Sequence, residues 1–157
     1  MFDSLFKKKI EVYSPTTGVI RPLSSVEDNT FSKGFIGEGF AIDPEDSIIC
    51  APVEGVVGTI FPTKHALGIS TEKGIDFILH VGIDTVKLKG IGFEALVEEG
   101  AKVRVGTPLL KVDYSYIQDS GYQTWVILVA SNAKKFNLES DLNTKVNIRQ
   151  KVGYCEI

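Results

Sequence analysis

The chain has 157 residues, of which 43% are hydrophobic and 24% are charged. This length and composition fit one globular domain with its own core, and no apolar run approaches the roughly 18 residues of a membrane-spanning helix. The formal net charge of -3 excludes a nucleic-acid-binding protein with a strongly basic face.

The first nine residues differ in pattern from the rest. Phe2, Leu5 and Phe6 fall on one face of a helical turn, and three lysines follow them. We expect a short amphipathic N-terminal segment over residues 1–9, either packed at a frayed terminus or in peripheral contact with a membrane. One domain is predicted to follow, over residues 10–157.

Strand signals dominate from residue 11 onward. Residues 14–20 and 51–57 share a small-Pro-x-x-Gly-apolar-apolar pattern, which predicts two equivalent turns that each lead into a strand. Gly37 and Gly39 interrupt an apolar segment, so a bulge or a close backbone approach is expected there.

The sequence of the second half of the chain predicts further short elements. They are a helical turn over residues 93–100, a hairpin over 100–110, a short helix over 113–121 capped by Asp113, a strand over 124–130 and terminal strands over 145–157. Many short strands separated by turns predict an all-β fold, a single-domain antiparallel β-sandwich or barrel with short helical turns.

The two cysteines, Cys50 and Cys155, lie far apart in the sequence. Two such residues make no disulfide framework. No signal-peptide pattern precedes them, so we expect reduced thiols and a cytoplasmic protein.

One of the two histidines ends a strand-like apolar run. Residues 74–86 read Gly-Ile-Asp-Phe-Ile-Leu-His-Val-Gly-Ile-Asp-Thr-Val. Alternation in a strand places Phe77 and Leu79 on one face, with Ile78 and His80 on the other. If Phe77 and Leu79 fill the core, a rigid strand holds the His80 imidazole at the protein surface.

The other histidine lies in the preceding segment, residues 61–69. A turn at Lys73 and Gly74 allows an antiparallel pairing that brings His65 close to His80. Thr63 precedes His65 by two residues, which places its hydroxyl on the same face of a strand. Spacing alone leaves two interpretations open, a paired site and two unrelated histidines.

Several motifs resemble one known family. The pattern of residues 74–86 is similar to the active-site signature of glucose-type enzyme IIA, a component of the bacterial phosphoenolpyruvate-dependent sugar phosphotransferase system. The run Thr63-Lys64-His65-Ala66 resembles that family's other histidine segment, and residues 37–42 and 51–55 add further matches. The resemblance extends from about residue 10 to the end of the chain.

The resemblance implies a phosphotransferase component that works through a phosphohistidine. His80 would carry the phosphoryl group on its Nε2 atom, His65 would donate a hydrogen bond to the phosphoryl oxygens, and Thr63 would bond the other nitrogen of His65. The implied donor is the histidine phosphocarrier protein HPr, and the implied acceptor is a cysteine on the IIB domain of a sugar permease. Regulatory target proteins are also implied.

Other residues are expected to support this site. Gly82 would permit close backbone approach, and Asp84 would orient a donor or repel a wrong partner. An apolar rim would exclude water and dock partner proteins, although for each member taken singly packing in the core is the better interpretation. Its predicted members are Phe31, Phe35, Phe61 and Ile78, the last at a position where the family commonly has phenylalanine.

Three alternatives concern metals and cofactors. His65 and His80 supply two of the four ligands of a closed zinc site, so no cofactor is expected to be required, and zinc would bind only if a partner's carboxylate completed the site. A lipoyl- or biotinyl-type carrier with Lys87 as the modified residue lacks the matching hairpin around that lysine. A β-sandwich zinc peptidase would need a third metal ligand, and the sequence has only two histidines.

Overall fold

The structure is a computed structural model that describes residues 9–157. The amphipathic segment expected over residues 1–9 therefore lies outside the described residues, apart from Lys9, which begins the first strand.

The described chain folds into three antiparallel sheets. The largest has eight strands in the order β13 (Lys145–Val146), β2 (Gly18–Pro22), β3 (Glu38–Pro44), β11 (Val126–Ala130), β7 (Asp76–Val81), β6 (Ala66–Ser70), β5 (Gly55–Ile60) and β9 (Lys102–Val103). The second contains β4 (Ile48–Cys50), β10 (Pro108–Val112) and β8 (Phe93–Ala95), in that order. The third contains β1 (Lys9–Tyr13), β14 (Lys151–Glu156) and β12 (Lys135–Leu138).

Within residues 9–157, helical structure is limited to short pieces. They are the α-helices α2 (Asn29–Ser32) and α3 (Tyr114–Asp119) and the 3₁₀ turns η1 (Leu23–Ser25) and η2 (Thr85–Leu88). The predicted cap of α3 is confirmed, because the Asp113 carboxylate accepts a hydrogen bond from the Tyr116 N–H. Within the described residues, no helix is long and apolar enough to span a membrane.

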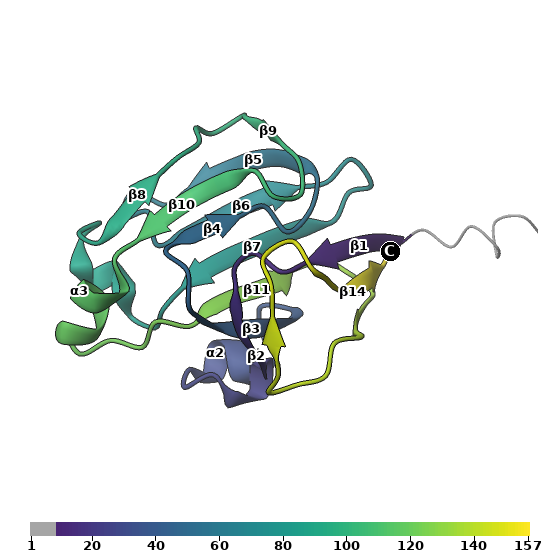
Figure 1. The fold of residues 1–157 in the computed structure, drawn as a ribbon. Helices are drawn as coiled ribbons and strands as arrows, with labels where there is room; N and C mark the ends of the chain where they lie inside the picture. Colours follow the sequence, from purple (N-terminus) through teal and green to yellow (C-terminus); the bar gives the residue numbers. More distant parts are fainter. Residues whose placement is uncertain (1–8) are drawn as a thin grey trace, which may run out of the picture.

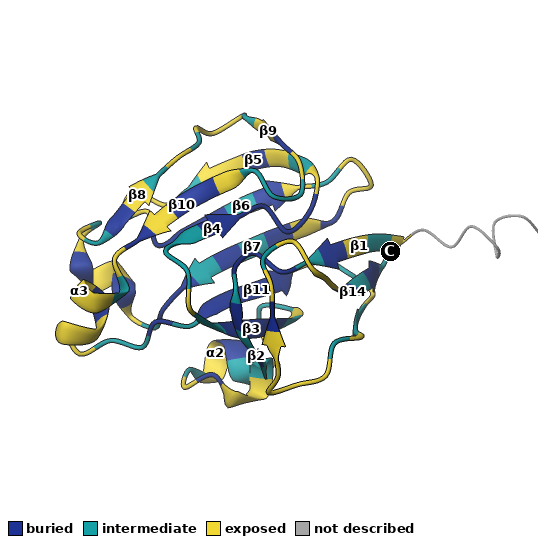
Figure 2. Ribbon diagram, viewed as in Figure 1, coloured by how far each residue is buried: buried dark blue, intermediate teal, exposed yellow. Residues whose placement is uncertain are grey.

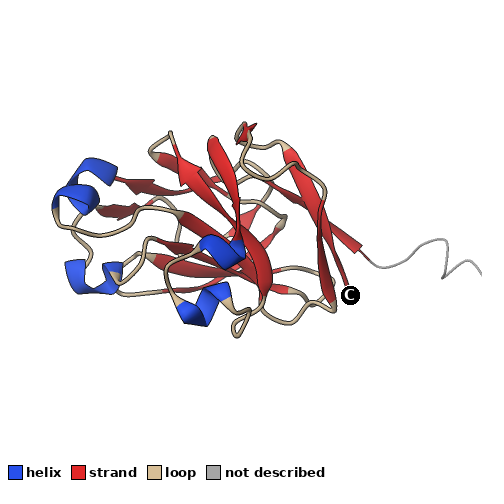
Figure 3. Ribbon diagram, turned by 90° about the horizontal axis from the view of Figure 1, so that it is seen from below, coloured by secondary structure: helices blue, strands red, loops and turns tan. Residues whose placement is uncertain are grey.

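The sheets pack as layers around one main core. Figure 1 shows β4, β10 and β8 lying across β5, β6 and β7, and Figure 3 shows the strands from below with the helical turns at the periphery. Side chains from these layers, including Ile49, Leu67, Phe77 and Leu110, form a single buried cluster. The predicted all-β sandwich is confirmed, and it is open rather than a closed barrel, because the largest described sheet ends at β13 and β9.

Each of the two predicted Pro-x-x-Gly turns leads directly into a strand. The Pro-x-x-Gly segments end at Gly18, the first residue of β2, and at Gly55, the first residue of β5. A Cβ atom at Gly18 would overlap the Asp43 carbonyl of the neighbouring strand, and one at Gly55 would overlap the Ser70 carbonyl. Both turns therefore need glycine because the next strand lies against the backbone.

The close backbone approach predicted near Gly39 is also confirmed. A Cβ atom at Gly39 would overlap the Leu128 carbonyl of β11. β11 is buried along its whole length (Figure 2), since every residue from Val126 to Ala130 lies inside the fold. Gly39 thus lets β3 lie close to β11, which pairs with β7 on its other side.

Two predictions for residues 93–110 are wrong. Residues 93–95 form strand β8 rather than a helical turn, because Phe93 packs in the core while Ala95 pairs with Leu110. The hairpin expected over residues 100–110 is absent from the described fold, because β9 pairs with β5 and β10 pairs with β4 and β8. Tertiary pairing overrides the local pattern in both cases.

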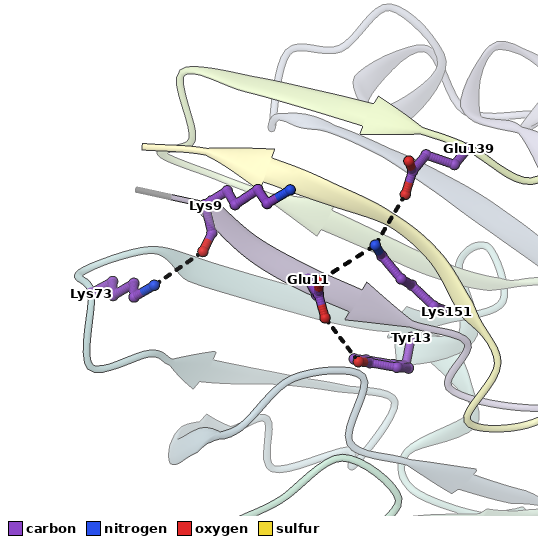
Figure 4. Close-up of polar contacts among 6 residues, drawn as sticks. All are labelled: Lys9, Glu11, Tyr13, Lys73, Glu139 and Lys151. Carbon is purple, nitrogen blue, oxygen red and sulfur yellow. Dashed lines mark hydrogen bonds and ion pairs between the residues drawn. The ribbon is translucent and has the colours of Figure 1, made fainter. Parts of the chain in front are cut away.

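A polar network ties the histidine-bearing hairpin to the first strand. The Lys73 ammonium, in the turn between β6 and β7, donates to the Lys9 carbonyl at 3.1 Å. Lys151 of β14 pairs with both Glu11 and Glu139, at 3.4 Å and 3.5 Å (Figure 4). These groups are solvent-exposed, so each pair contributes little stability by itself, but together they link β1, β14 and the β6–β7 turn.

Two mid-strand glycines give a matched stability test. Gly39→Ala should destabilise the protein by about 1–3 kcal/mol or more, because the new methyl group meets the Leu128 carbonyl. Gly68→Ala in β6 should be tolerated, because its Cβ would lie 3.7 Å from the nearest oxygen, the Phe77 carbonyl. Urea unfolding of both variants measures the difference, and equal midpoints would contradict it.

Candidate functional site

The two histidines meet through the pairing of β6 with β7. Ala66, the first residue of β6, pairs with His80 near the end of β7, and the His65 carbonyl accepts from the Val81 N–H at 2.8 Å. The two imidazole rings stand nearly perpendicular, with centroids 4.9 Å apart. The prediction that a hairpin brings His65 and His80 together is confirmed.

Thr63 reaches His65 by a different route from the one predicted. Neither residue lies in a strand, because the chain turns at Lys64, whose φ is 59° and whose N–H donates to the Phe61 carbonyl at 2.7 Å. This turn places the Thr63 Oγ1 atom 2.6 Å from the His65 Nδ1 atom. A tight turn, rather than strand alternation, therefore fixes the contact.

His80 is less exposed than strand alternation predicts. Phe77 and Leu79 fill the main core as expected, but the opposite face of β7 is itself partly covered by α2. Phe31 of α2 lies with its ring centroid 4.9 Å from that of His80, and it packs in a second apolar cluster with Ile127 and Val129 of β11. His80 is therefore half-buried beside a small second core.

This environment keeps the His80 imidazole neutral. The pKa of His80 is lowered from 6.5 to about 4, mainly by burial and to a lesser extent by the neighbouring His65, while the Gly82 backbone, Asp28 and Asp84 oppose the shift. The pKa of His65 is also lowered, because burial disfavours its charged form. At neutral pH both rings are uncharged, and an uncharged imidazole keeps a free lone pair for nucleophilic attack.

The two nitrogens of His80 have different surroundings. Nδ1 is fully enclosed and makes no hydrogen bond of good geometry. The Gly82 backbone raises the pKa of the ring, because a backbone carbonyl favours the protonated imidazole. Nδ1 is the enclosed, inward nitrogen, which leaves Nε2 as the nitrogen that a reacting group can approach.

Gly82 is required by the backbone that follows His80. Its φ is 75°, and its N–H donates to the Trp125 carbonyl at 2.8 Å. A Cβ atom there would lie 2.5 Å from both the Gln123 carbonyl oxygen and the Thr85 Cγ2 atom. The structure thus gives Gly82 a role in fixing the turn beside His80.

Two carboxylates lie near enough to His80 to raise its pKa, and the sequence indicated only one of them. Asp84 is exposed, with a left-handed φ of 59°. Asp28, which sequence reasoning missed, caps α2 by accepting from the Thr30 N–H at 2.8 Å. The run Asp-Asn-Thr-Phe from Asp28 to Phe31 is an N-cap pattern that could have located both the helix and this carboxylate.

The four predicted rim residues occupy unequal positions. Phe31 contacts His80, and Phe61 stands edge-on to His65 with ring centroids 5.4 Å apart. Ile78 joins the apolar cluster around Phe31. Phe35 is 75% exposed, and no aromatic contact joins it to either histidine within the described chain.

The site offers two ligands to a metal ion. Among residues 9–157 there is no group of three or more histidine, cysteine or carboxylate side chains arranged to hold a metal. A closed tetrahedral zinc site therefore does not fit this chain alone. The facing imidazoles of His65 and His80 could bind zinc only with ligands from another molecule.

Comparison with known proteins identifies the family. Residues 10–136 match the family model described as phosphoenolpyruvate-dependent sugar phosphotransferase system, EIIA 1. The chain belongs to this family. A glucose-specific EIIA component of the system from Staphylococcus epidermidis is 37% identical over 139 residues, which cover 85% of this chain and 84% of that protein.

Two further comparisons agree with this family, one with a sequence and one with a solved structure. A beta-glucoside-specific EIIBCA component from Bacillus subtilis is 42% identical over 126 residues, or 80% of this chain, and the match spans only 21% of that longer protein. The structure of glucose permease IIA from Mycoplasma capricolum superimposes with a TM-score of 0.86 at 37% identity, covering 95% of this chain and 97% of that one. Membership of this family argues against the lipoyl-carrier and zinc-peptidase alternatives. In addition, Lys87 lies in η2 rather than at a hairpin tip.

The depressed pKa of His80 predicts how stability depends on pH. The folded pKa of about 4 lies below the ordinary 6.5, so the unfolded chain binds this proton more readily. The neutral His80 ring contributes roughly 3 kcal/mol at most to the free energy of unfolding. This contribution is fully present above pH 6.5 and is lost as the pH falls toward 4. His80→Gln should flatten this slope in urea unfolding, and NMR of the wild-type ring should show a midpoint near 4; a midpoint near 6.5 would contradict the prediction.

Proposed function

We propose that this chain is a phosphohistidine carrier of the sugar phosphotransferase system. One observation carries the proposal: a neutral His80 has one enclosed nitrogen, Nδ1, and stands face to edge with a second histidine. Its Nε2 lone pair attacks the phosphorus of a phosphohistidine on the donor. The new N–P bond forms as the donor's N–P bond breaks. The donor ring, protonated on its other nitrogen, keeps the bonding electrons and leaves as a neutral imidazole, while His80 keeps its Nδ1 proton.

His65 and Thr63 are proposed to stabilise the transferred group. The short Thr63–His65 contact of 2.6 Å fixes the ring when the Thr63 hydroxyl donates to Nδ1. His65 then carries its proton on Nε2, and that N–H can donate to a phosphoryl oxygen on His80. Phosphoryl transfer depends mainly on positioning and charge stabilisation, so one well-placed donor has a large effect.

Release to the next protein follows the same geometry in reverse. A cysteine thiolate of the acceptor attacks the phosphorus, the S–P bond forms, and the N–P bond to His80 breaks. The departing electron pair returns to Nε2, and the ring regains its neutral form. Burial favours this neutral product, so the environment that keeps His80 nucleophilic also makes it a good leaving group.

The proposed partners are the histidine phosphocarrier protein HPr as donor and the IIB domain of a sugar permease as acceptor. The Bacillus subtilis relative is named an EIIBCA component, which joins EIIB and EIIA in one protein. Asp28 and Asp84 place negative charge near His80, which favours basic groups on a docking partner. Regulatory targets of the unphosphorylated form are a further proposal that rests on family membership.

The proposed transfer needs no cofactor, since nucleophile and hydrogen-bond donor both come from the protein. Zinc could bridge His65 and His80 to a partner that adds a carboxylate. We also propose a cytoplasmic location and a single functional domain over residues 10–157. Buried, unpaired Cys50 and Cys155 suit a reducing compartment.

Replacing the proposed acceptor tests the function directly. His80→Gln should take up no acid-labile phosphate when incubated with phosphoenolpyruvate, enzyme I and HPr, because its amide has no nucleophilic lone pair. Its circular dichroism should match the wild type. Labelling of this variant at the wild-type rate would rule out His80 as the acceptor.

His65→Gln should separate acceptance from donation. Glutamine can offer an N–H to a phosphoryl oxygen, so phosphorylation of His80 should stay near normal. It cannot reproduce an imidazole held by Thr63, so transfer to the IIB domain should fall by about 10²-fold or more, as for loss of one oxyanion-type donor. Rapid-quench assays with labelled protein measure both steps, and undiminished transfer to IIB would assign His65 no role in release.

A further inference from the structure

One arginine shares a face of the largest sheet with the reacting histidine. Arg21 of β2 pairs with Ala41 of β3, which pairs with Ile127 of β11. Ile127 in turn pairs with His80 of β7. Residues opposite one another in neighbouring strands point to the same side of a sheet. Arg21 therefore lies on the His80 face, three strand spacings or roughly 14 Å from that histidine.

The Arg21 side chain reaches from β2 across β3 to the one tryptophan of the chain. Its guanidinium carbon lies 5.8 Å from the centre of the Trp125 ring, within the range of a cation–π contact. The residue opposite Arg21 on β3 is the small Ala41, which leaves room for this crossing. Trp125 packs against the apolar cluster beside His80, so a fixed aromatic ring holds the positive charge on that face.

Two further contacts order the guanidinium but leave most of its donors unused. Nη1 donates to the Asn143 Oδ1 atom at 3.0 Å, and the Asn143 N–H donates to the Ile20 carbonyl at 2.7 Å. Asp43 approaches Nη2 only to 3.8 Å, which is too far for a hydrogen bond. Nε is enclosed and has no acceptor among residues 9–157. An arginine ordered in this way loses little conformational entropy when it binds a carboxylate.

The internal contacts do not satisfy the charge of Arg21. The side chains of Arg21 and Asp43 are 31% and 44% exposed, and an ion pair at this separation and exposure contributes little stability. The enclosed Nε atom and the Trp125 ring nevertheless remove water from part of the guanidinium. A partly dehydrated cation with unused donors attracts a carboxylate more strongly than a fully hydrated one does.

We infer that Arg21, held on Trp125, binds a carboxylate side chain of the IIB domain that takes the phosphoryl group from His80. The inference rests on the proposed carrier function. Arginine and tryptophan are the residue types that most often dominate the binding energy of protein interfaces. A planar guanidinium also selects for a carboxylate, because it can offer two parallel N–H donors to the two oxygens.

The acceptor fits this contact better than the donor does. Two relatives in this one phosphoenolpyruvate-dependent family are named for different sugars, glucose and beta-glucoside. Discrimination between acceptors of different permeases needs contacts that differ from one carrier to another, because specificity is a difference of affinities. Arg21 and Trp125 are suited to that task, since they lie outside the segments with the family resemblance, residues 37–42, 51–55, 63–66 and 74–86.

The charges on this face favour one orientation of the docked IIB domain. Asp28 and Asp84 act near His80 and favour basic groups there. Arg21 favours an acidic group that is displaced across β11 and β3. An acceptor rotated by half a turn would bring like charges together. The inference therefore places an aspartate or glutamate of IIB within roughly 14 Å of its reacting cysteine.

Changing the charge at position 21 tests the inference. In transfer from phosphorylated His80, Arg21→Gln should raise the KM for the IIB domain by roughly 10-fold and Arg21→Glu by roughly 30-fold or more, with kcat unchanged. Arg21→Lys keeps the charge but loses the planar fork, so its KM should lie between those of the wild type and Arg21→Gln. The KM for phosphorylated HPr should stay at the wild-type value in all three variants.

A matched variant and a salt series separate docking from general effects. Lys111→Gln removes one positive charge from an exposed position of β10 in the second sheet, and it should leave the KM for IIB unchanged. The wild-type KM should rise more steeply with salt concentration than that of Arg21→Gln, because the lost contact is electrostatic. If Arg21→Glu does not fold, Arg21→Gln, Arg21→Lys and the salt series carry the test.

Three results would overturn the inference. They are an unchanged KM for IIB in the folded Arg21 variants, an equal rise in Lys111→Gln, and a rise for HPr as large as the rise for IIB. Failure of the carrier function itself would look different, because the wild-type protein would then take no phosphate from HPr.

Discussion

The site depends on the antiparallel pairing of β6 with β7. Both histidines lie within one hairpin, and the register that sets Ala66 opposite His80 brings the two rings to a centroid distance of 4.9 Å. A register slip of one residue would turn His80 into the main core and expose Leu79. The main core therefore fixes the geometry of the histidine pair, because burial of Phe77 and Leu79 leaves only one register for β7.

Burial on the second face gives His80 its chemistry. The cluster around Phe31, Ile127 and Val129 removes water from one side of the ring, and the resulting shift keeps the imidazole neutral. The same face must stay open enough for a partner protein to reach Nε2. Short α2 meets both demands, because Phe31 covers one side of His80 while the Gly68 side remains hollow.

The sequence predicted the histidine hairpin better than it predicted the packing around that hairpin. Strand alternation, the turn near Gly74 and the histidine motifs located the hairpin, because these signals are local. The Thr63 contact was expected for the wrong reason, since a left-handed Lys64 is not visible in a propensity pattern. Partial burial of His80 and the partners of β9 and β10 depend on long-range packing, which residue spacing does not encode. The cap at Asp28 is local, but its position near His80 also depends on that packing.

The central claim is that a neutral His80 accepts the phosphoryl group on Nε2, while Nδ1 stays turned inward. NMR of ¹⁵N-histidine-labelled protein, phosphorylated by HPr, measures phosphorus coupling to each ring nitrogen directly. The account predicts coupling to Nε2 of His80, with the His65 ring unmodified. Coupling to Nδ1 of His80, or to either nitrogen of His65, would contradict it.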